Sequence, residues 1–172
     1  MRLQIIGLGL ALLAPAGLAQ AQPAAQPAPP PPSPAALPLA LATEAAQTAI
    51  SSCAASGYRV SVVVVDAAGA PRLVMAGDGA AGRTVEIGQR KAFTAATLNR
   101  PTTEVAEQVT TDRALAARIA VDTRMISWAG ARPVHRADGT LIGALGVSGA
   151  PGGDKDDACA AAGLARVQDR LG

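Results

Sequence analysis

Residues 140–163 read TLIGALGVSGAPGGDKDDACAAAG, a pattern typical of a buried strand, a glycine-rich corner and the first turns of a helix. Leu141 to Val147 is apolar apart from two glycines, which suits a strand whose backbone is closely approached by a neighbour or a ligand. Ser148 to Gly153 holds three glycines and a proline in six residues, which ends the strand. Three aspartates between positions 154 and 157 then lie where a helix N-terminus favours negative charge.

The corner itself can hold an anion, because backbone N–H groups at a helix N-terminus bind carboxylates. The alternative is a plain strand-to-helix connection, which the spacing alone favours. No Gly-Lys-Ser/Thr follows the glycines, so the corner is not a P-loop, and Gly-Ala-Leu-Gly alone is not a dinucleotide fingerprint.

Two N-terminal segments precede the folded part. Residues 1–21 combine an early arginine, an apolar core and an Ala-Gln-Ala cleavage pattern, which predicts a secretory signal peptide; an uncleaved anchor is the alternative. Residues 22–38 are rich in proline and alanine and predict an extended linker. We therefore expect a secreted or periplasmic domain over residues 39–172, without a membrane span.

The remaining pattern predicts helices and strands in alternating groups. A helix begins after Pro38 and ends at Gly57, and the next helix runs from Thr84, a candidate N-cap, to about Leu98. We expect short helical pieces over 102–121 and a last helix from Asp154 to the chain end. The expected strands are residues 59–66, 72–75, 132–136 and 140–147, the last two joined by a type I′ turn at Asp138-Gly139.

This order of elements predicts a single α+β domain in which an antiparallel sheet is layered with helices. Val62 and Val64 lie on one face of the first strand and Val63 and Val65 on the other, so that strand should be central and covered on both sides. The second helix carries unusually small residues, which makes it a candidate wall for a pocket or an interface.

Four blocks, in order, resemble the GlcG/HbpS family of small haem-binding proteins. They are VVVVDAAG at 62–69, GDGA at 77–80, RKAFTA at 90–95 and the stretch from Ile142 to Gly163. The resemblance covers about Leu39 to Leu171. It implies a profilin- or PAS-like sandwich, an oligomer and a small-ligand pocket that includes Lys91. Without the resemblance, Lys91 would be interpreted as a solvated surface charge. Two departures from the family pattern fall near the expected site. Ala76 stands where many members carry an arginine, and Gly130-Ala131-Arg132-Pro133 stands where the family has Gly-Gly-x-Pro.

Classical catalytic groups are missing from the sequence, so the catalytic residues stay unknown. His135 is the single histidine, and no metal-ligand spacing occurs. A lone histidine is more often a satisfied strand residue than a ligand. Asp78, in the GDGA block, is either a turn former or a site residue. The net charge of +2 becomes +2 − 1 = +1 without Arg2, and no basic run with aromatic residues appears, which argues against nucleic-acid binding.

Haem is the ligand that the resemblance implies. Its propionates need cations or N–H groups, for which the candidates are Lys91, Arg132, Arg136 and the corner with Ser148 and Gly149. The candidates for an axial atom are His135, Met75, Met125 and Tyr58. Two alternatives are an enzyme acting on a small organic acid through Lys91 or Asp78, and an oligomeric accessory protein without a ligand.

Cys53 lies late in the first predicted helix and Cys159 early in the last. Antiparallel packing of these helices would bring the two together, and an exported chain meets an oxidising compartment, so we predict a disulfide; two buried free thiols are the alternative. With only Tyr58, Phe93 and Trp128 as aromatic residues, the core is thin, and we expect a homo-oligomer.

Overall fold

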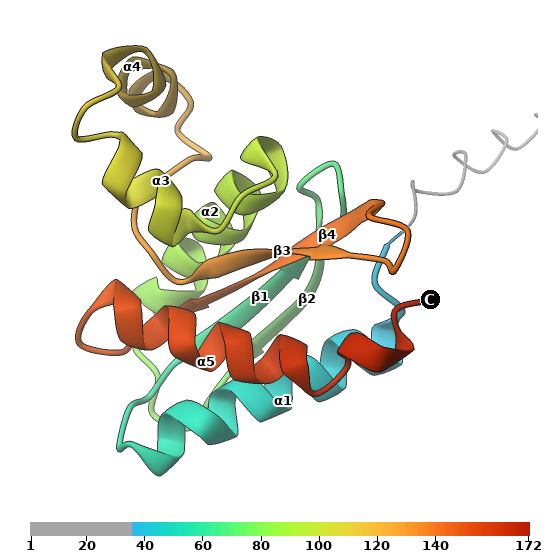
Figure 1. Cartoon of the computed structure of the whole chain (residues 1–172). Helices are drawn as coiled ribbons and strands as arrows, with labels where there is room; N and C mark the ends of the chain where they lie inside the picture. Colours follow the sequence, from blue (N-terminus) through green and yellow to red (C-terminus); the bar gives the residue numbers. More distant parts are fainter. Residues whose placement is uncertain (1–35) are drawn as a thin grey trace, which may run out of the picture. The chain divides into compact units, whose positions relative to one another are not determined.

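The computed structural model describes residues 36–172, so the predicted signal peptide and most of the predicted linker lie outside the described residues. Five α-helices, four strands and one short 3-10 helix occupy this part of the chain (Figure 1). Their bounds are α1 Leu39–Ala55, β1 Ser61–Val65, β2 Pro71–Ala76, α2 Arg83–Leu98, α3 Thr102–Gln108, α4 Arg113–Val121, β3 Ala131–His135, β4 Leu141–Ser148, α5 Gly153–Ala165 and η1 Gln168–Arg170.

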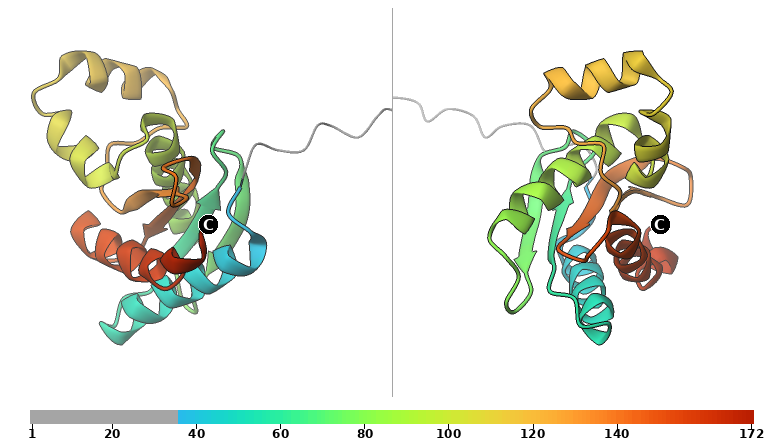
Figure 2. Two further views of the ribbon diagram at one scale, coloured as in Figure 1. Left: turned by 45° about the vertical axis from the view of Figure 1, so that its right-hand side comes forward. Right: turned by 90° about the vertical axis from the view of Figure 1, so that its left-hand side faces the viewer.

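The strands form one antiparallel sheet in the order β2-β1-β4-β3, with α1 and α5 on one face and α2 on the other (Figures 1 and 2). Val62 and Val64 of the central strand β1 pack in the cluster with α1 and α5, while Val63 and Val65 pack against α2. The predicted α+β class and the central, doubly covered strand are therefore confirmed.

Both hairpins close with a glycine in the left-handed conformation. Gly69 and Gly139 each have φ of 83°, and their N–H groups donate to Asp66 at 2.9 Å and to Arg136 at 3.0 Å. The predicted type I′ turn is wrong, because such a turn needs positive φ at both central residues and Asp138 does not have it. A three-residue loop with glycine at its last position takes its place in both hairpins.

The two glycines of β4 are required for different structural reasons. Gly146 lies under α2, where an added Cβ would overlap the carbonyl oxygen of Gly88 and lie 2.9 Å from the Ala92 nitrogen. Gly143 has φ of 147° and faces the backbone of Val65 in the neighbouring strand. The expected close approach to this strand is confirmed, and at Gly146 the approaching backbone is a helix of the same chain.

The disulfide prediction is confirmed. Cys53 of α1 and Cys159 of α5 are bonded, with Cα atoms 5.6 Å apart and a sequence separation of 106. The two helices lie side by side over the sheet, as the prediction required (Figure 1). Cys53 is fully buried, so the bond lies inside the core.

Two predicted helix ends are wrong. Gly82, not Thr84, precedes α2, and no side chain caps it. The buried Thr84 hydroxyl instead bonds to Ala81 O at 2.6 Å and Ser61 Oγ at 2.8 Å, which anchors α2 to β1. The last helix ends at Ala165, and η1 follows two residues later; Val167 and Leu171 belong to the core cluster.

None of the helices within residues 36–172 is long and apolar enough to cross a bilayer.

Candidate functional site

An open cleft of about 1230 Å³ lies where four connecting segments meet. These are the turn after α1, the loop before α2, the loop before β3 and the corner between β4 and α5. Trp128 is 56% exposed, and Tyr58 and Ile87 are half-buried. The cleft thus combines apolar surface with polar groups. The apolar surface comes from Tyr58, Ile87, Trp128 and Pro151, and the polar groups include Arg59 and Arg83.

Two arginines supply positive charge to the cleft. Arg59 and Arg83 are exposed, and neither forms an ion pair within residues 36–172. A guanidinium binds carboxylates through a fork of N–H groups, so both are available to an acidic ligand.

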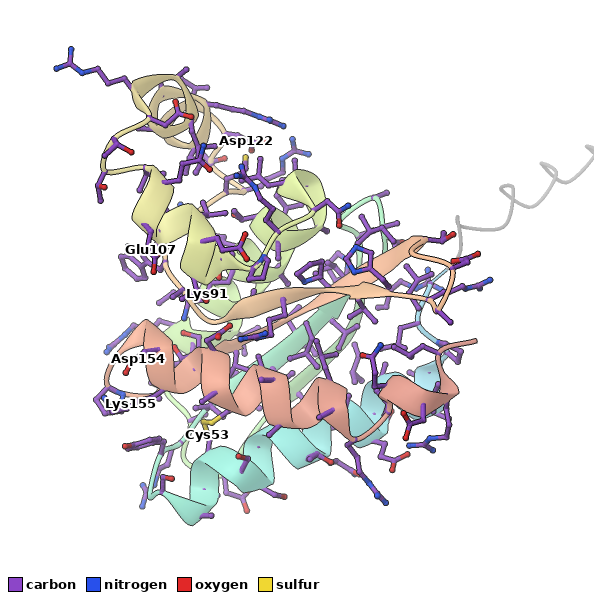
Figure 3. The ribbon with its side chains drawn as sticks, in the orientation of Figure 1. Cys53, Lys91, Glu107, Asp122, Asp154 and Lys155 are labelled. Carbon is purple, nitrogen blue, oxygen red and sulfur yellow. A yellow bond between two sulfur atoms is a disulfide. The ribbon has the colours of Figure 1, made fainter. Side chains whose placement is uncertain are left out.

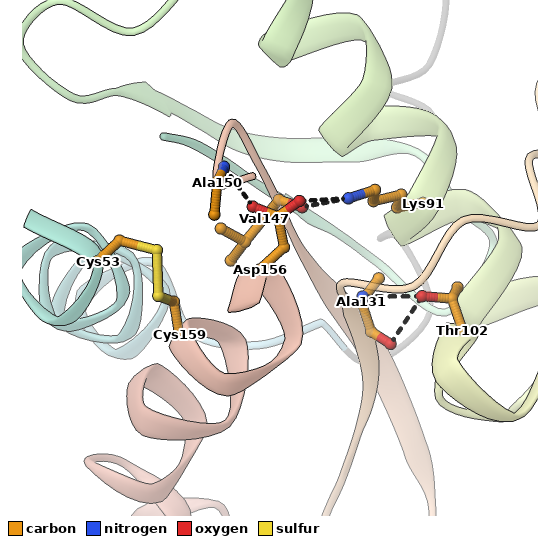
Figure 4. Close-up of polar contacts among 8 residues, drawn as sticks. All are labelled: Cys53, Lys91, Thr102, Ala131, Val147, Ala150, Asp156 and Cys159. Carbon is orange, nitrogen blue, oxygen red and sulfur yellow. Dashed lines mark hydrogen bonds and ion pairs between the residues drawn. A yellow bond between two sulfur atoms is a disulfide. The ribbon is translucent and has the colours of Figure 1, made fainter. Parts of the chain in front are cut away.

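Beneath these groups, Lys91 of α2, which is labelled in Figure 3, forms a buried ion pair with Asp156 of α5 (Figure 4). Lys91 Nζ donates to Asp156 Oδ2 at 2.7 Å and to the carbonyl of Val147 at 3.1 Å. The second carboxylate oxygen, Asp156 Oδ1, accepts the Ala150 N–H at 2.9 Å. The side chains are 3% and 4% exposed, so the pair ties α2, β4 and α5 together at the base of the cleft.

The Asp156 carboxyl has an unusual protonation equilibrium. Burial raises its pKa, while the Lys91 ammonium and the Ala150 N–H act in the opposite direction by favouring the charged form. The net result is a pKa above the ordinary value for an aspartate, because desolvation outweighs the favourable contacts, and Lys91 limits this rise.

Gly130, just before β3, makes space for this pair. Its φ is 124°, and an added Cβ would lie 2.7 Å from both Asp156 Cβ and Lys91 Nζ. The next residue, Ala131, donates its N–H to the Thr102 hydroxyl at 2.9 Å, which holds the turn against α3 (Figure 4). Residues 130–133 depart from the family pattern, but they keep a glycine at position 130, where a side chain would have no room.

The predicted corner residues lie at the cleft. Ser148 and Gly149 line the cleft together with Lys91. The anion that the corner holds in this chain is the carboxylate of Asp156, bound by the Ala150 N–H. Asp78 is exposed in the loop before α2 and is not among the residues that line the cleft, although the neighbouring Gly79 is.

Arg132 and His135 lie elsewhere, along a second groove of about 640 Å³ between β3, α5 and the end of α2. Arg132 forms two bonds with Asp157 of α5, at 3.0 and 2.6 Å. His135 Nε2 lies 2.7 Å from Asn99 Oδ1, so this histidine already has a partner. The structure thus separates these two residues from Lys91, Ser148 and Gly149.

The candidates for an axial haem ligand are also dispersed. Met125 is 1% exposed inside a core cluster with α3 and α4, and Met75 packs against the cluster beneath α1 and α5. Tyr58 alone of the four lines the larger cleft.

Sequence reasoning missed the importance of Asp156 and Gly130. It treated Asp156 as a helix N-terminal charge, whereas the structure buries both Asp156 and Asp157, the first against Lys91 and the second against Arg132. Among residues 36–172 no group of three acidic, histidine or cysteine side chains could hold a metal ion.

The fold and the cleft define a small α+β domain with a large, partly apolar cleft. The family model described as haem degrading protein HbpS-like matches residues 37–165, and the chain belongs to this HbpS-like family.

Solved structures agree with this assignment. The crystal structure of HbpS is 38% identical, with a TM-score of 0.70 over 77% of this chain and 90% of that one. A Streptomyces reticuli HbpS double mutant is 36% identical, with a TM-score of 0.70 over 85% and 97%. A PduOC:heme complex shares the fold at 24% identity, with a TM-score of 0.70 over 80% and 97%. A search of curated proteins finds no match.

Proposed function

We propose that the protein is an exported haem-binding protein that holds haem in the cleft above Lys91 and Asp156. The observation that carries the proposal is the combination of exposed Trp128 with Arg59 and Arg83, two arginines without an ion pair within residues 36–172, on one cleft of about 1230 Å³. Haem requires apolar contact for its ring and cations for its propionates, and this cleft has both. The family description, which names haem degradation, supports the same ligand.

The residues present fit haem to different degrees. Tyr58 and Trp128 supply aromatic surface, and Arg59 and Arg83 supply the cations. Among the cleft residues, Tyr58 is the one whose side chain belongs to the Tyr, His, Cys and Met set of haem ligands. Haem supplies the iron and its redox chemistry when bound; the chain supplies the slot, the charges and an oxygen atom.

Haemin titration of the purified protein tests the proposal. We expect a saturable Soret shift that Tyr58→Phe alters and that the double variant Arg59→Gln, Arg83→Gln weakens. His135→Ala is the matched comparison from the second groove, and it should leave the spectrum unchanged. If His135→Ala loses the Soret shift and Tyr58→Phe keeps it unchanged, the proposed haem site in the cleft is contradicted, and haem binds in the second groove instead. No shift at all would favour the accessory protein without a ligand.

An enzyme acting on a small organic acid is the alternative activity. Its two proposed residues are not equally placed, because Lys91 lies at the base of the cleft and Asp78 is exposed outside it. Any turnover would therefore depend on Lys91 rather than on Asp78.

Export is supported by two features. Residues 1–21 have the composition of a signal peptide. The disulfide between Cys53 and Cys159 is of the kind that persists in oxidising compartments. We therefore place the mature protein in the periplasm or outside the cell.

Self-association is the second proposed property. Val74 is 49% exposed on β2, which lies at the edge of the sheet formed within residues 36–172, and an edge strand with apolar side chains can pair with another copy. We expect light scattering to report a multiple of the protomer mass at micromolar concentration. Val74→Lys should lower this mass, whereas Ala117→Lys, on the exposed side of α4, should not. A monomer at every concentration would contradict the proposal.

A further inference from the structure

A second pocket, of about 460 Å³, lies on a different side of α2 from the cleft. It is enclosed by the turn between β1 and β2, by α2 and by Thr123 and Arg124. Pocket volumes of about 300 to 1,000 Å³ are usual for small molecules, so this one has the size of a metabolite site.

Part of the pocket lining is apolar. It consists of Phe93, which is 9% exposed, Pro71 and residues 68–70. Arg124 lies over the Phe93 ring at 4.5 Å from the centroid. The charge of Arg124 is already matched, because its Nε and Nη2 donate to Asp122 at 2.9 and 2.8 Å.

Arg90 carries the unmatched positive charge. Its Nη2 donates to the carbonyl of Met125 at 2.8 Å, which fixes the guanidinium at the pocket. Its Nε is buried without a hydrogen-bond partner, and Arg90 forms no ion pair within residues 36–172. Its positive charge is therefore not neutralised by any carboxylate of residues 36–172, and only its terminal Nη groups are left for a ligand.

Glu86 carries the unmatched negative charge, one helical turn before Arg90. The two residues have the spacing that normally gives a helix ion pair, but they are not paired, and both line the pocket. A simple anion would be attracted by Arg90 and repelled by Glu86. A ligand with both charges would satisfy both residues.

We propose that this pocket binds a small zwitterion of the α-amino-acid class with an apolar side chain. The ligand carboxylate pairs with the fork of Arg90, its ammonium pairs with Glu86, and its side chain packs on Phe93 and Pro71. The site shares no lining residue with the haem cleft, so each proposal can fail without the other.

Isothermal titration calorimetry with three probes tests this site. L-phenylalanine should bind saturably, whereas 3-phenylpropionate, which lacks the ammonium, and 2-phenylethylamine, which lacks the carboxylate, should bind about tenfold or more weakly. No saturable heat with L-phenylalanine, or equal binding of 3-phenylpropionate, would overturn the proposal.

Variants distinguish recognition from folding. Arg90→Gln should weaken L-phenylalanine binding about tenfold or more, and Arg113→Gln, an exposed arginine of α4, should leave it unchanged. Because Arg90→Gln also removes the bond to Met125, Glu86→Gln is the second variant. Glu86 is exposed, so the fold should be kept, and L-phenylalanine should then bind no better than 3-phenylpropionate. Unchanged L-phenylalanine binding in both Arg90→Gln and Glu86→Gln would refute the assignment.

Discussion

Lys91→Met is expected to lower the free energy of unfolding by about 3 to 5 kcal/mol, because it leaves the Asp156 carboxylate buried without its cation. The two side chains are 3% and 4% exposed, so water cannot replace the lost partner. Urea unfolding followed by circular dichroism measures the change. Lys155→Met is the matched control, since this lysine is the only other one in the chain. Its side chain is 41% exposed and lies 3.7 Å from Asp154, so we expect a change within about 0.5 kcal/mol.

The double variant Lys91→Met, Asp156→Asn separates charge from packing. Asparagine keeps an oxygen that accepts the Ala150 N–H, but carries no charge to be desolvated. We expect the double variant to be more stable than Lys91→Met alone. Equal losses in Lys91→Met and Lys155→Met would show that the pair is not buried as described.

The loss in Lys91→Met should also depend on pH. The folded-state pKa of Asp156 lies above its value near 3.8 in the unfolded chain, and removal of Lys91 raises it further. At pH values between the unfolded and the folded pKa of Asp156, the folded state binds more protons than the unfolded chain. The stability that this group contributes is therefore greatest in acid and falls as the pH rises through the folded pKa. The deficit of Lys91→Met should therefore be smaller at pH 4 than at pH 7, and the double variant should lack this trend.

Removal of the disulfide has the other large expected effect. Cross-linking positions 106 residues apart restricts the unfolded chain, and the chain-entropy model gives about 4 to 5 kcal/mol as an upper value. We expect the double variant Cys53→Ala, Cys159→Ala to unfold at a lower urea concentration than the wild type. Wild-type protein reduced in urea and refolded with reductant is the control, because it keeps both sulfur atoms and separates loop closure from lost packing.

Mass spectrometry of the unreduced, exported protein tests the bond and the cleavage together. The expected mass is that of residues 22–172 with no alkylated thiol. Two alkylated thiols would contradict the disulfide, and a mass that includes residues 1–21 would contradict signal-peptide removal.

Much of the fold could be predicted because its signals are local or repeated along the chain. Five consecutive buried residues in β1, valines at four of them, show that both faces of the central strand are covered. The cysteines were assigned correctly because each lies in a helix whose apolar face could be recognised. Turn types and helix ends were less predictable, since Thr84 bonds to Ser61, 23 residues away, instead of capping its own helix.

The sequence by itself determined the fold class, the family and the disulfide partners, because hydrophobic periodicity and residue type decide which faces are buried. Only the tertiary structure decided the composition of the site. Lys91 and Asp156 are 65 residues apart, and their contact depends on how closely α2 and α5 approach β4. The same packing separated His135 and Arg132 from Ser148 and Gly149. Such distances result from side-chain volumes on several elements at once, with Gly130 and Gly146 permitting the closest approaches, and no single segment encodes them.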